Sequence, residues 1–90
     1  MKYSVRWVTK AEFELARLWL NAADRAAITS AANEIDARLA INPDVEGESR
    51  SGGRRILLVA PLGVTYDVRH ADRVVLVLDV WKFEKRARQP

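Results

Sequence analysis

The spacing of the apolar residues changes once along this chain, at a segment rich in turn-forming residues. Over residues 10–41 apolar side chains recur every three or four positions, which is the spacing of one helix face. Over residues 54–81 they fall into short runs and alternations typical of β-strands. Residues 42–53 between them contain three glycines and a proline. At 90 residues the chain has room for one domain, so both halves must share a single core.

A strand and two helices are expected in the first half. Residues 3–8 alternate between apolar and polar side chains, which predicts a short strand. Thr9 followed three residues later by Glu12 matches a capping box and predicts a helix over residues 10–20. A second helix is expected to end just before Pro43, because the residue preceding a proline avoids the α region.

Three strands with short connections are expected in the second half, over residues 54–60, 64–69 and 74–81. Consecutive strands joined by short turns form an antiparallel meander. The last of them is almost continuously apolar, so we expect it near the centre of the sheet. The predicted fold is therefore α+β in the order β-α-α-β-β-β, an antiparallel sheet with a helical hairpin packed on one face.

Residues 1–90 are predicted to form this one domain, with residues 82–90 as a basic C-terminal tail. The absence of cysteine and the single histidine exclude a disulfide scaffold and a Cys/His zinc site. We therefore expect no cofactor, no metal and no small-molecule substrate. No apolar run approaches the roughly 20 residues of a membrane span, and the N-terminus lacks a signal peptide's apolar region. The expected location is the cytoplasm, without a membrane partner.

Charge is divided unevenly between the two halves. Residues 1–49 carry six basic and eight acidic groups, a balance of −2, whereas residues 50–90 carry nine and four, a balance of +5. Seven of those nine basic groups are arginine, whose planar guanidinium matches phosphate well. The second half thus predicts a basic surface suited to a polyanion or an acidic partner, or a basic face that serves solubility alone.

Strand parity assigns several side chains to opposite faces of the sheet. Tyr66 falls on the side expected to pack on the helices, which predicts a core tyrosine with a satisfied hydroxyl. The open face is predicted to carry Thr65, Asp67, Arg69, Asp79 and Trp81. On that face Arg69 can pair with either aspartate, and Trp81 can be a base-stacking platform, a partner anchor or a core residue.

Other residues have simpler interpretations. Arg54 and Arg55 straddle the two faces of a strand, so one of them must point outward in either register, either to bind a ligand or as a solvated charge at the edge. His70 lies in a predicted turn, where a solvated structural role is expected. Trp7 and Trp19 are predicted to be core residues.

This order of elements, with its strand signatures, resembles the RelE/ParE superfamily of toxins from bacterial toxin–antitoxin modules. The resemblance spans almost the whole chain and is carried mostly by structural residues. They are Asn42-Pro43 at the helix exit, Gly47 and Gly53 in the loop, Arg54-Arg55-Ile56-Leu57, the segment Leu62-Gly63-Val64-Thr65-Tyr66-Asp67-Val68, and Val74 to Val80.

The resemblance implies a small toxin that is neutralised by a cognate antitoxin, a largely disordered acidic protein that folds on binding. Exposed apolar groups near Trp81 and Phe83 are expected to receive it. RelE-like members cut messenger RNA on the ribosome without a metal, using basic and tyrosine side chains. ParE-like members poison DNA gyrase and are not nucleases. Three interpretations stay open: a ribosome-dependent endoribonuclease, a gyrase inhibitor, and a homologue that only binds its antitoxin.

The resemblance also points to site residues. RelE-like enzymes place one arginine just before the Val-x-Tyr segment, where Gly63 stands here, and another just after the last strand, at Phe83. The lysine pair of their second strand corresponds to Arg54 or Arg55. The candidate catalytic residues are Arg54, Arg55, Arg69 and Lys82. The candidates for binding a nucleic acid or a partner are Arg73, Trp81, Phe83, Lys85, Arg86 and Arg88.

Overall fold

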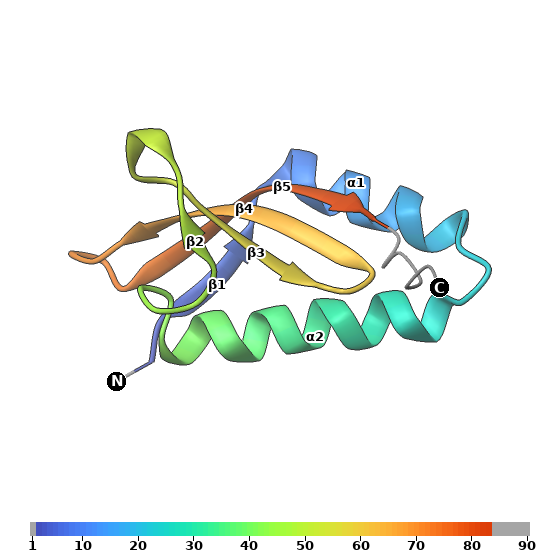
Figure 1. Cartoon of the computed structure of the whole chain (residues 1–90), viewed down its shortest axis with the longest axis horizontal. Coiled ribbons are helices and arrows are strands. Elements are labelled where there is room, and N and C mark those ends of the chain that lie inside the picture. The colour runs from blue at the N-terminus through green and yellow to red at the C-terminus, as the bar shows by residue number, and fades with distance from the viewer. Residues whose placement is uncertain (1, 84–90) are drawn as a thin grey trace, which may run out of the picture.

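The protein is a five-stranded sheet packed against two helices, as the computed structural model shows for residues 2–83 (Figure 1). The strand order in the sheet is β1-β5-β4-β3-β2. The elements are β1 (Ser4–Trp7), α1 (Thr9–Leu20), α2 (Arg25–Ile41), β2 (Glu48–Ser49), a 3-10 turn (Ser51–Gly53), β3 (Arg55–Val59), β4 (Leu62–Arg69) and β5 (Val74–Lys82). The predicted order of helices and strands is confirmed, with the short β2 as an addition.

The sheet is mixed, which corrects the expectation of a purely antiparallel one. Strands β2 to β5 pair antiparallel in sequence order, but β1 pairs parallel with β5, with Ser4 opposite Val74 and Trp7 opposite Val77. The helical hairpin separates β1 from the other strands and returns the chain so that β5 runs alongside it in the same direction. Strand β5 therefore lies between β1 and β4, near the centre as its apolar sequence predicts.

Helix α1 begins differently from what the sequence predicts. Helix α1 starts at Thr9, and the cap residue is Val8, whose carbonyl accepts from the Glu12 amide without any side-chain cap. The capping-box prediction is thus wrong, because the extended backbone of β1 passes directly into the helix. Asp24 caps α2 by accepting from the Ala27 amide at 3.0 Å. Helix α2 ends at Ile41, as the proline predicts.

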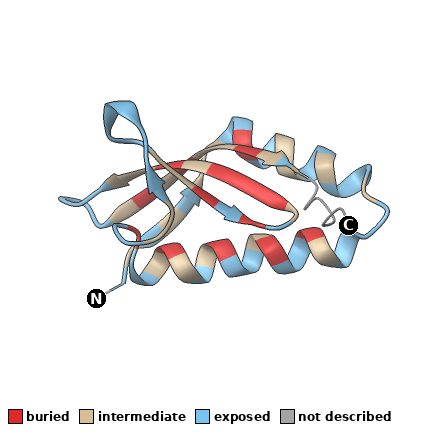
Figure 2. Ribbon diagram, viewed as in Figure 1, coloured by how far each residue is buried: buried red, intermediate tan, exposed pale blue. Residues whose placement is uncertain are grey.

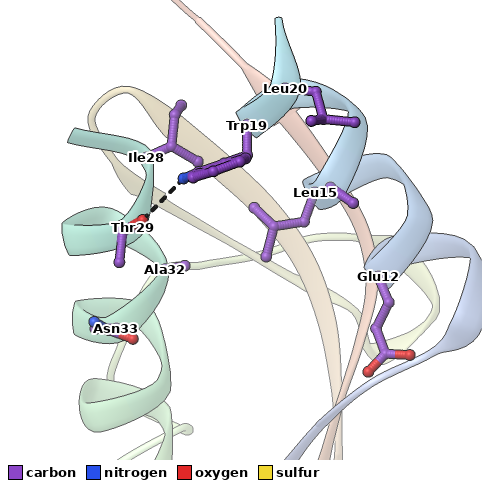
Figure 3. A pocket seen from close by; sticks show the side chains of 9 residues that line it. Glu12, Leu15, Trp19, Leu20, Ile28, Thr29, Ala32 and Asn33 are labelled. Atoms are coloured by element: carbon purple, nitrogen blue, oxygen red, sulfur yellow. Dashed lines mark hydrogen bonds between the residues drawn. The ribbon is translucent and has the colours of Figure 1, made fainter. Parts of the chain in front are cut away.

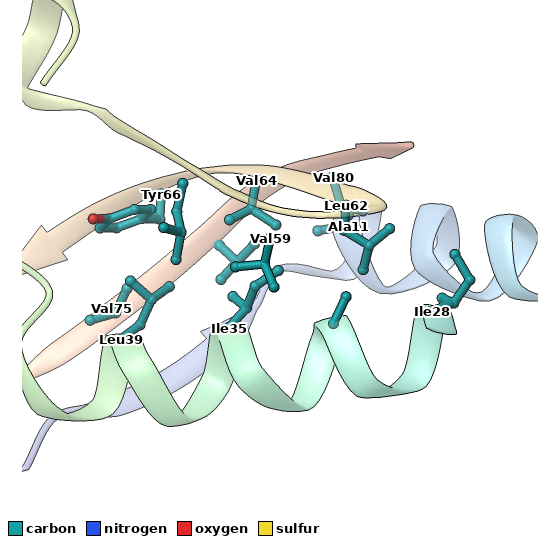
Figure 4. Packing of buried hydrophobic residues seen from close by; sticks show 13 residues of the cluster. Ala11, Ile28, Ile35, Leu39, Val59, Leu62, Val64, Tyr66, Val75 and Val80 are labelled. Atoms are coloured by element: carbon teal, nitrogen blue, oxygen red, sulfur yellow. The ribbon is translucent and has the colours of Figure 1, made fainter. Parts of the chain in front are cut away.

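The core lies between the sheet and the helices (Figures 2 and 4). Its buried members come from α1, α2, β3, β4 and β5: Ala11, Ile28, Ala31, Ile35, Leu39, Leu57, Val59, Leu62, Val64, Tyr66, Val75, Val77 and Val80. Trp7 packs against this cluster, and its indole N–H donates to Asp36 Oδ1 at 2.7 Å. Trp19 is 38% exposed, so its predicted place in the core is wrong. The apolar stripe of α1 is wider than the surface that covers it.

Candidate functional site

The sheet face away from the core is the first candidate surface, and its side chains follow from the strand register. Gly63 lies between Trp81 on β5 and Leu58 on β3, and Thr65 lies opposite Asp79. The predicted parity is therefore confirmed. An irregularity after Thr65 leaves one extra residue in β5, since the next pair joins Tyr66 to Val77. This shift keeps both Val77 and Val80 in the core.

Trp81 covers the backbone of Gly63. A Cβ placed on Gly63 would come within 2.6 Å of the indole ring, so no larger residue fits there unless the ring moves. This is the position at which the resemblance places a catalytic arginine. The structure fills it with an aromatic ring, and Leu58 extends the apolar surface with 55% of its area exposed.

The carboxylates of the open face are each next to a cation. The Lys10 ammonium lies 2.7 Å from Asp79, and the Arg69 guanidinium lies 3.6 Å from Asp67. Arg69 therefore pairs with Asp67, one of the two partners predicted for it. These cations reduce the repulsion that the carboxylates would exert on a bound polyanion.

Two arginines of this face are left for a ligand. Arg54 has extended backbone (φ −83, ψ 157) just before β3, which puts its exposed side chain on the same side as Ile56. Arg6 on β1 lies opposite Leu76 and is exposed too. Among residues 2–83, no carboxylate is within ion-pair distance of Arg54 or Arg6. The open face therefore combines an aromatic ring with unpaired positive charge.

Arg55 points to the other side and holds a loop in place. Its guanidinium donates to the carbonyls of Glu46 at 3.0 Å and of Gly47 at 3.2 Å. The Tyr66 hydroxyl donates to the carbonyls of Glu46 at 2.6 Å and Pro43 at 2.9 Å, and it accepts from Arg55 at 3.3 Å. As predicted, one member of the Arg54–Arg55 pair faces outward, and it is Arg54. Arg55 is engaged by the fold itself.

Tyr66 is the fully buried tyrosine that the sequence predicts, with its hydroxyl satisfied. Burial raises the pKa of its phenol above the ordinary value, although the hydrogen bond and charge of Arg55 oppose this shift. A phenol with a raised pKa and no access to solvent is held in its neutral form. Tyr66 therefore stabilises the fold and is not placed to exchange protons with a substrate.

His70 and Arg73 lie at the β4–β5 hairpin and contact the N-terminal segment. The Tyr3 hydroxyl lies 3.1 Å from Nδ1 of His70, and Asp44 lies 3.3 Å from its Nε2. The Arg73 guanidinium sits over the Tyr3 ring, 5.4 Å from its centroid. His70 is exposed in a turn, as predicted, and it joins the hairpin to the loop after α2.

The remaining predicted site residues lie at the end of β5. Lys82 is exposed and pairs with Leu62, and the Phe83 amide donates to the Pro61 carbonyl at 2.9 Å. Lys85, Arg86 and Arg88, with the rest of the predicted tail, lie outside the described residues. Within residues 2–83 no three His, Cys, Asp or Glu side chains are grouped to hold a metal ion. No helix in the same range is long and apolar enough to cross a membrane.

A second candidate surface, which sequence reasoning missed, is an open groove of about 520 Å³ between α1 and α2 (Figure 3). Its apolar lining includes Leu15, Leu20 and Ile28. Trp19 bridges the groove, because its indole N–H donates to Thr29 Oγ1 at 3.2 Å. The sequence did contain an indication of this groove: the apolar stripe of α1 is broader than the single helix face that packs on the sheet.

Arg25 fixes the position of Trp19 in this groove. Its guanidinium stacks over the indole, 4.5 Å from the ring centroid, and donates to the carbonyls of Trp19 and Leu20. The ring is thus held in one orientation although it is partly exposed. Leu20 beside it is 61% exposed. The groove is a preformed apolar surface that the described residues leave uncovered.

Comparison with known proteins gives a fold but no sequence family. No family model matches the chain, and no curated protein matches it. Among solved structures, the toxin–antitoxin complex RelBE2 from Mycobacterium tuberculosis aligns with a TM-score of 0.74 and 19% identity, over 91% of this chain and 92% of that one. The isolated E. coli RelE toxin aligns with a TM-score of 0.68 and 17% identity, over 93% and 87%.

A third structure, the chromosomal ParDE system from P. aeruginosa, aligns with a TM-score of 0.62 and 18% identity, over 91% of this chain and 97% of that one. Both the RelE and the ParE branches are therefore represented among the similar structures. The chain has the fold of RelE/ParE-superfamily toxins. The resemblance read from the sequence is confirmed at the level of fold.

Proposed function

We propose that this protein is the toxin component of a type II toxin–antitoxin module. The observation that carries the proposal is the fold, which the chain shares with structures of toxins over about nine-tenths of its length. Two of the similar structures are described as a toxin–antitoxin complex or system. The expected partner is accordingly a protein antitoxin that keeps the toxin inactive.

The groove between α1 and α2 supports an antitoxin partner. Its lining is apolar, and Trp19 and Leu20 expose area that a partner helix could bury. The chain carries a net charge of +3, which complements an acidic antitoxin. An antitoxin segment that is disordered alone gains the apolar contacts of this groove when it folds against it.

For the toxic activity we propose binding and cleavage of messenger RNA on the ribosome, at the open face of the sheet. Metal-free cleavage requires activation of the 2′-hydroxyl, stabilisation of the extra charge on the phosphate, and protonation of the leaving 5′-oxygen. Arg54 and Arg69 are both on this face. Arg54, which has no acidic partner among residues 2–83, can stabilise the phosphate directly, whereas Arg69 would first have to leave its ion pair with Asp67. Lys82, the candidate for proton transfer in the sequence, pairs with the core residue Leu62 at the end of β5, so it points to the side of the sheet opposite Trp81.

Inhibition of DNA gyrase is the second candidate, and one observation favours it. The Trp81 ring covers Gly63, so the arginine that RelE-like enzymes use at this position has no counterpart here. A ParE-like toxin needs no catalytic set and would bind its target through the helical hairpin and the C-terminal tail. A toxin homologue that only binds its antitoxin would show neither activity.

Induced expression in a susceptible bacterium tests these candidates together. Pulse labelling of protein and DNA synthesis is followed after induction of the wild type and of the Arg54→Ala/Arg69→Ala variant. The proposal predicts a rapid halt in protein synthesis with cut transcripts, which the variant relieves. An early halt in DNA synthesis would indicate gyrase as the target. Normal growth with folded protein would contradict both toxic activities.

A further inference from the structure

Helix α1 exposes a row of apolar side chains on the side that faces away from the core. Phe13, Ala16 and Leu20 follow the spacing i, i+3 and i+7, so they form one stripe along the helix. At about 3.6 residues per turn, this stripe lies opposite Ala11, which is fully buried. Phe13 is 73% exposed, Leu20 is 61% exposed, and Ala16 is exposed too. Helix α1 is therefore apolar toward the core and also toward solvent.

This outer stripe, made of Phe13, Ala16 and Leu20, is a different surface from the groove between the helices. Ala16 and Leu20 lie at the border of both surfaces, whereas Phe13 does not line the groove. A partner that fills only the groove would leave the Phe13 ring exposed. A continuous apolar patch of this kind is typical of a surface that contacts another protein.

Two charges of opposite sign lie at the two ends of the outer stripe. Glu12 is in the first turn of α1, and its carboxylate forms no ion pair within residues 2–83. Arg25 is at the other end, where its guanidinium donates to two carbonyls of the last turn of α1 and meets no carboxylate among the described residues. Arg17 and Glu14, which lie between these ends, pair with each other. The stripe thus has an acidic end and a basic end.

We propose that a second copy of this chain covers the outer stripe, with the two α1 helices packed antiparallel about a two-fold axis near Ala16. In this dimer Phe13 of one copy contacts Leu20 of the other, and the contact occurs twice because the same patch is used by both copies. The small side chain of Ala16 lets the helices approach closely at the axis. The inference does not depend on the proposed function.

The unpaired charges match this antiparallel arrangement. Glu12 and Trp19 are seven residues apart, so they lie on the same flank of α1, and the Arg25 guanidinium stacks over the Trp19 ring at 4.5 Å. A two-fold axis perpendicular to the helices brings the same flank of both copies together with their ends reversed. Glu12 of each copy therefore meets Arg25 of the other. An acidic partner protein fits less well, because Glu12 would repel it.

The apolar area of this surface is sufficient for a weak dimer. A large apolar side chain presents on the order of 200 Å², so the exposed parts of Phe13, Trp19 and Leu20 amount to roughly 350 Å² per copy. The pair would bury about 700 Å² of apolar surface, to which the polar rim adds, whereas stable complexes bury about 1,200–2,000 Å² in total. We therefore expect a reversible dimer with a dissociation constant on the order of 10 µM.

Sedimentation velocity of the purified full-length chain tests this directly, over a concentration series that spans the expected dissociation constant. The mass should rise from 10.2 kDa toward twice that value. Phe13→Ser should weaken the dimer about tenfold or more, because the ring is at the centre of the contact with Leu20. Val45→Ser is the matched control, since Val45 is 71% exposed in the loop after α2, and it should leave the dimer unchanged.

Exchange of the two charges tests the direction of the helices. Glu12→Arg and Arg25→Glu should each weaken the dimer, because each homodimer then brings like charges together twice. An equimolar mixture of the two variants should recover most of the wild-type association, because opposite charges meet at both ends of the mixed dimer. Glutamate is acceptable at the first position of α2, where the helix dipole favours a negative charge. Circular dichroism checks the fold of each variant.

Three results would overturn the proposal: a wild type that stays monomeric throughout the series, a folded Phe13→Ser variant that dimerises as tightly as Val45→Ser, or a mixture of folded charge variants that stays monomeric. If Arg25→Glu does not fold, Phe13→Ser and Glu12→Arg still decide the outcome. The mass is measured without antitoxin or target. A monomeric wild type would leave the proposed toxin function intact, and normal growth on induction would leave the dimer intact.

Discussion

The two faces of the sheet differ in how completely the protein uses its own side chains. On the helix-covered face the residues are buried, and the one polar side chain among the core residues, Tyr66, has its hydroxyl hydrogen-bonded. On the open face Leu58 is 55% exposed and Trp81 is half-buried, and Arg54 and Arg6 have no acidic partner among residues 2–83. The side chains of the helix-covered face make contacts within the protein, whereas several side chains of the open face are available to contact a ligand.

Strand β3 contains this contrast in neighbouring residues. Leu57 is 3% exposed and packs in the core, whereas Leu58 is 55% exposed. Arg55 is bound by loop carbonyls, whereas Arg54, just before the strand and on the opposite side, has no acidic partner among residues 2–83. Neighbouring residues on a strand point to opposite faces of the sheet. The same substitution made at each of two neighbours therefore separates an effect on stability from an effect on binding.

Substitution of each leucine by alanine should give the largest difference. Leu57→Ala should lower the free energy of unfolding by about 2–5 kcal/mol, because it leaves a cavity in the core. Leu58→Ala should change it by less than about 1 kcal/mol. Urea denaturation followed by circular dichroism measures both. Equal losses from the two variants would contradict the assignment of the faces.

Tyr66→Phe should cost about 1–3 kcal/mol of stability, because it removes a hydroxyl that bonds the carbonyls of Pro43 and Glu46. The loop after α2 should then open more readily, which hydrogen exchange detects. Arg55→Gln should have a similar effect on the loop, whereas Arg54→Gln on the open side should leave exchange unchanged. Unaltered protection in Tyr66→Phe would mean that the loop is held by other contacts.

The raised pKa of Tyr66 adds a dependence on pH. Since the folded state holds the phenolic proton more tightly than the unfolded state, this contribution to stability is complete below the ordinary phenol pKa of about 10. It is lost as the pH rises through the raised pKa of the folded protein. The stability advantage of the wild type over Tyr66→Phe should therefore shrink above about pH 10. A difference in the free energy of unfolding between the wild type and Tyr66→Phe that grows above about pH 10 would contradict this prediction.

The helical groove provides a comparison at equal exposure. Leu20 and Ile41 are both 61% exposed, but Leu20 lines the groove and Ile41 does not. Leu20→Ser should weaken antitoxin binding about tenfold, whereas Ile41→Ser should leave it unchanged. Titration calorimetry with the purified antitoxin, the short acidic protein expected to be encoded beside this one, gives the affinities. If both variants bind equally well, the antitoxin docks elsewhere.

The ion pair between Lys10 and Asp79 should give the smallest effect. Both side chains are well exposed, so Lys10→Gln should alter stability by no more than about 1 kcal/mol. The substitution leaves Asp79 uncompensated on the open face, and RNA affinity should fall roughly twofold. Asp79→Asn should instead leave the affinity equal to or above that of the wild type. A fall in RNA affinity in both variants would show that the ion pair affects binding by maintaining the local structure and not by its charge.

Much of this fold could be predicted from the sequence, because the spacing of apolar residues along each helix and strand reflects which of its sides is buried. The alternation in β4 placed Tyr66 inside and Thr65 outside, and both positions are confirmed. The parallel pairing of β1 could not be predicted, since strand direction depends on how the helical hairpin returns the chain. Thr9 is not the cap because the helix begins one residue earlier than predicted, with Val8 in the cap position and Thr9 as the first helical residue.

The candidate sites were less predictable than the fold. Parity correctly put Trp81 on the open face, but the contact between its ring and Gly63 depends on a cross-strand register that no local pattern fixes. The exposure of Trp19 depends on how far α1 lies from α2, which is a tertiary property. Ion pairs such as Lys10–Asp79 join residues far apart in the sequence and are visible only in three dimensions.

The most direct test of an RNA-directed toxin is primer extension on a reporter transcript in a cell-free translation reaction. Our account predicts new 5′ ends in the coding region and a fall in protein synthesis when the wild type is added, both only while ribosomes translate. The Arg54→Ala/Arg69→Ala protein should produce fewer of these ends, and the antitoxin should abolish them. Full-length transcript and undiminished synthesis with correctly folded wild type would contradict the account.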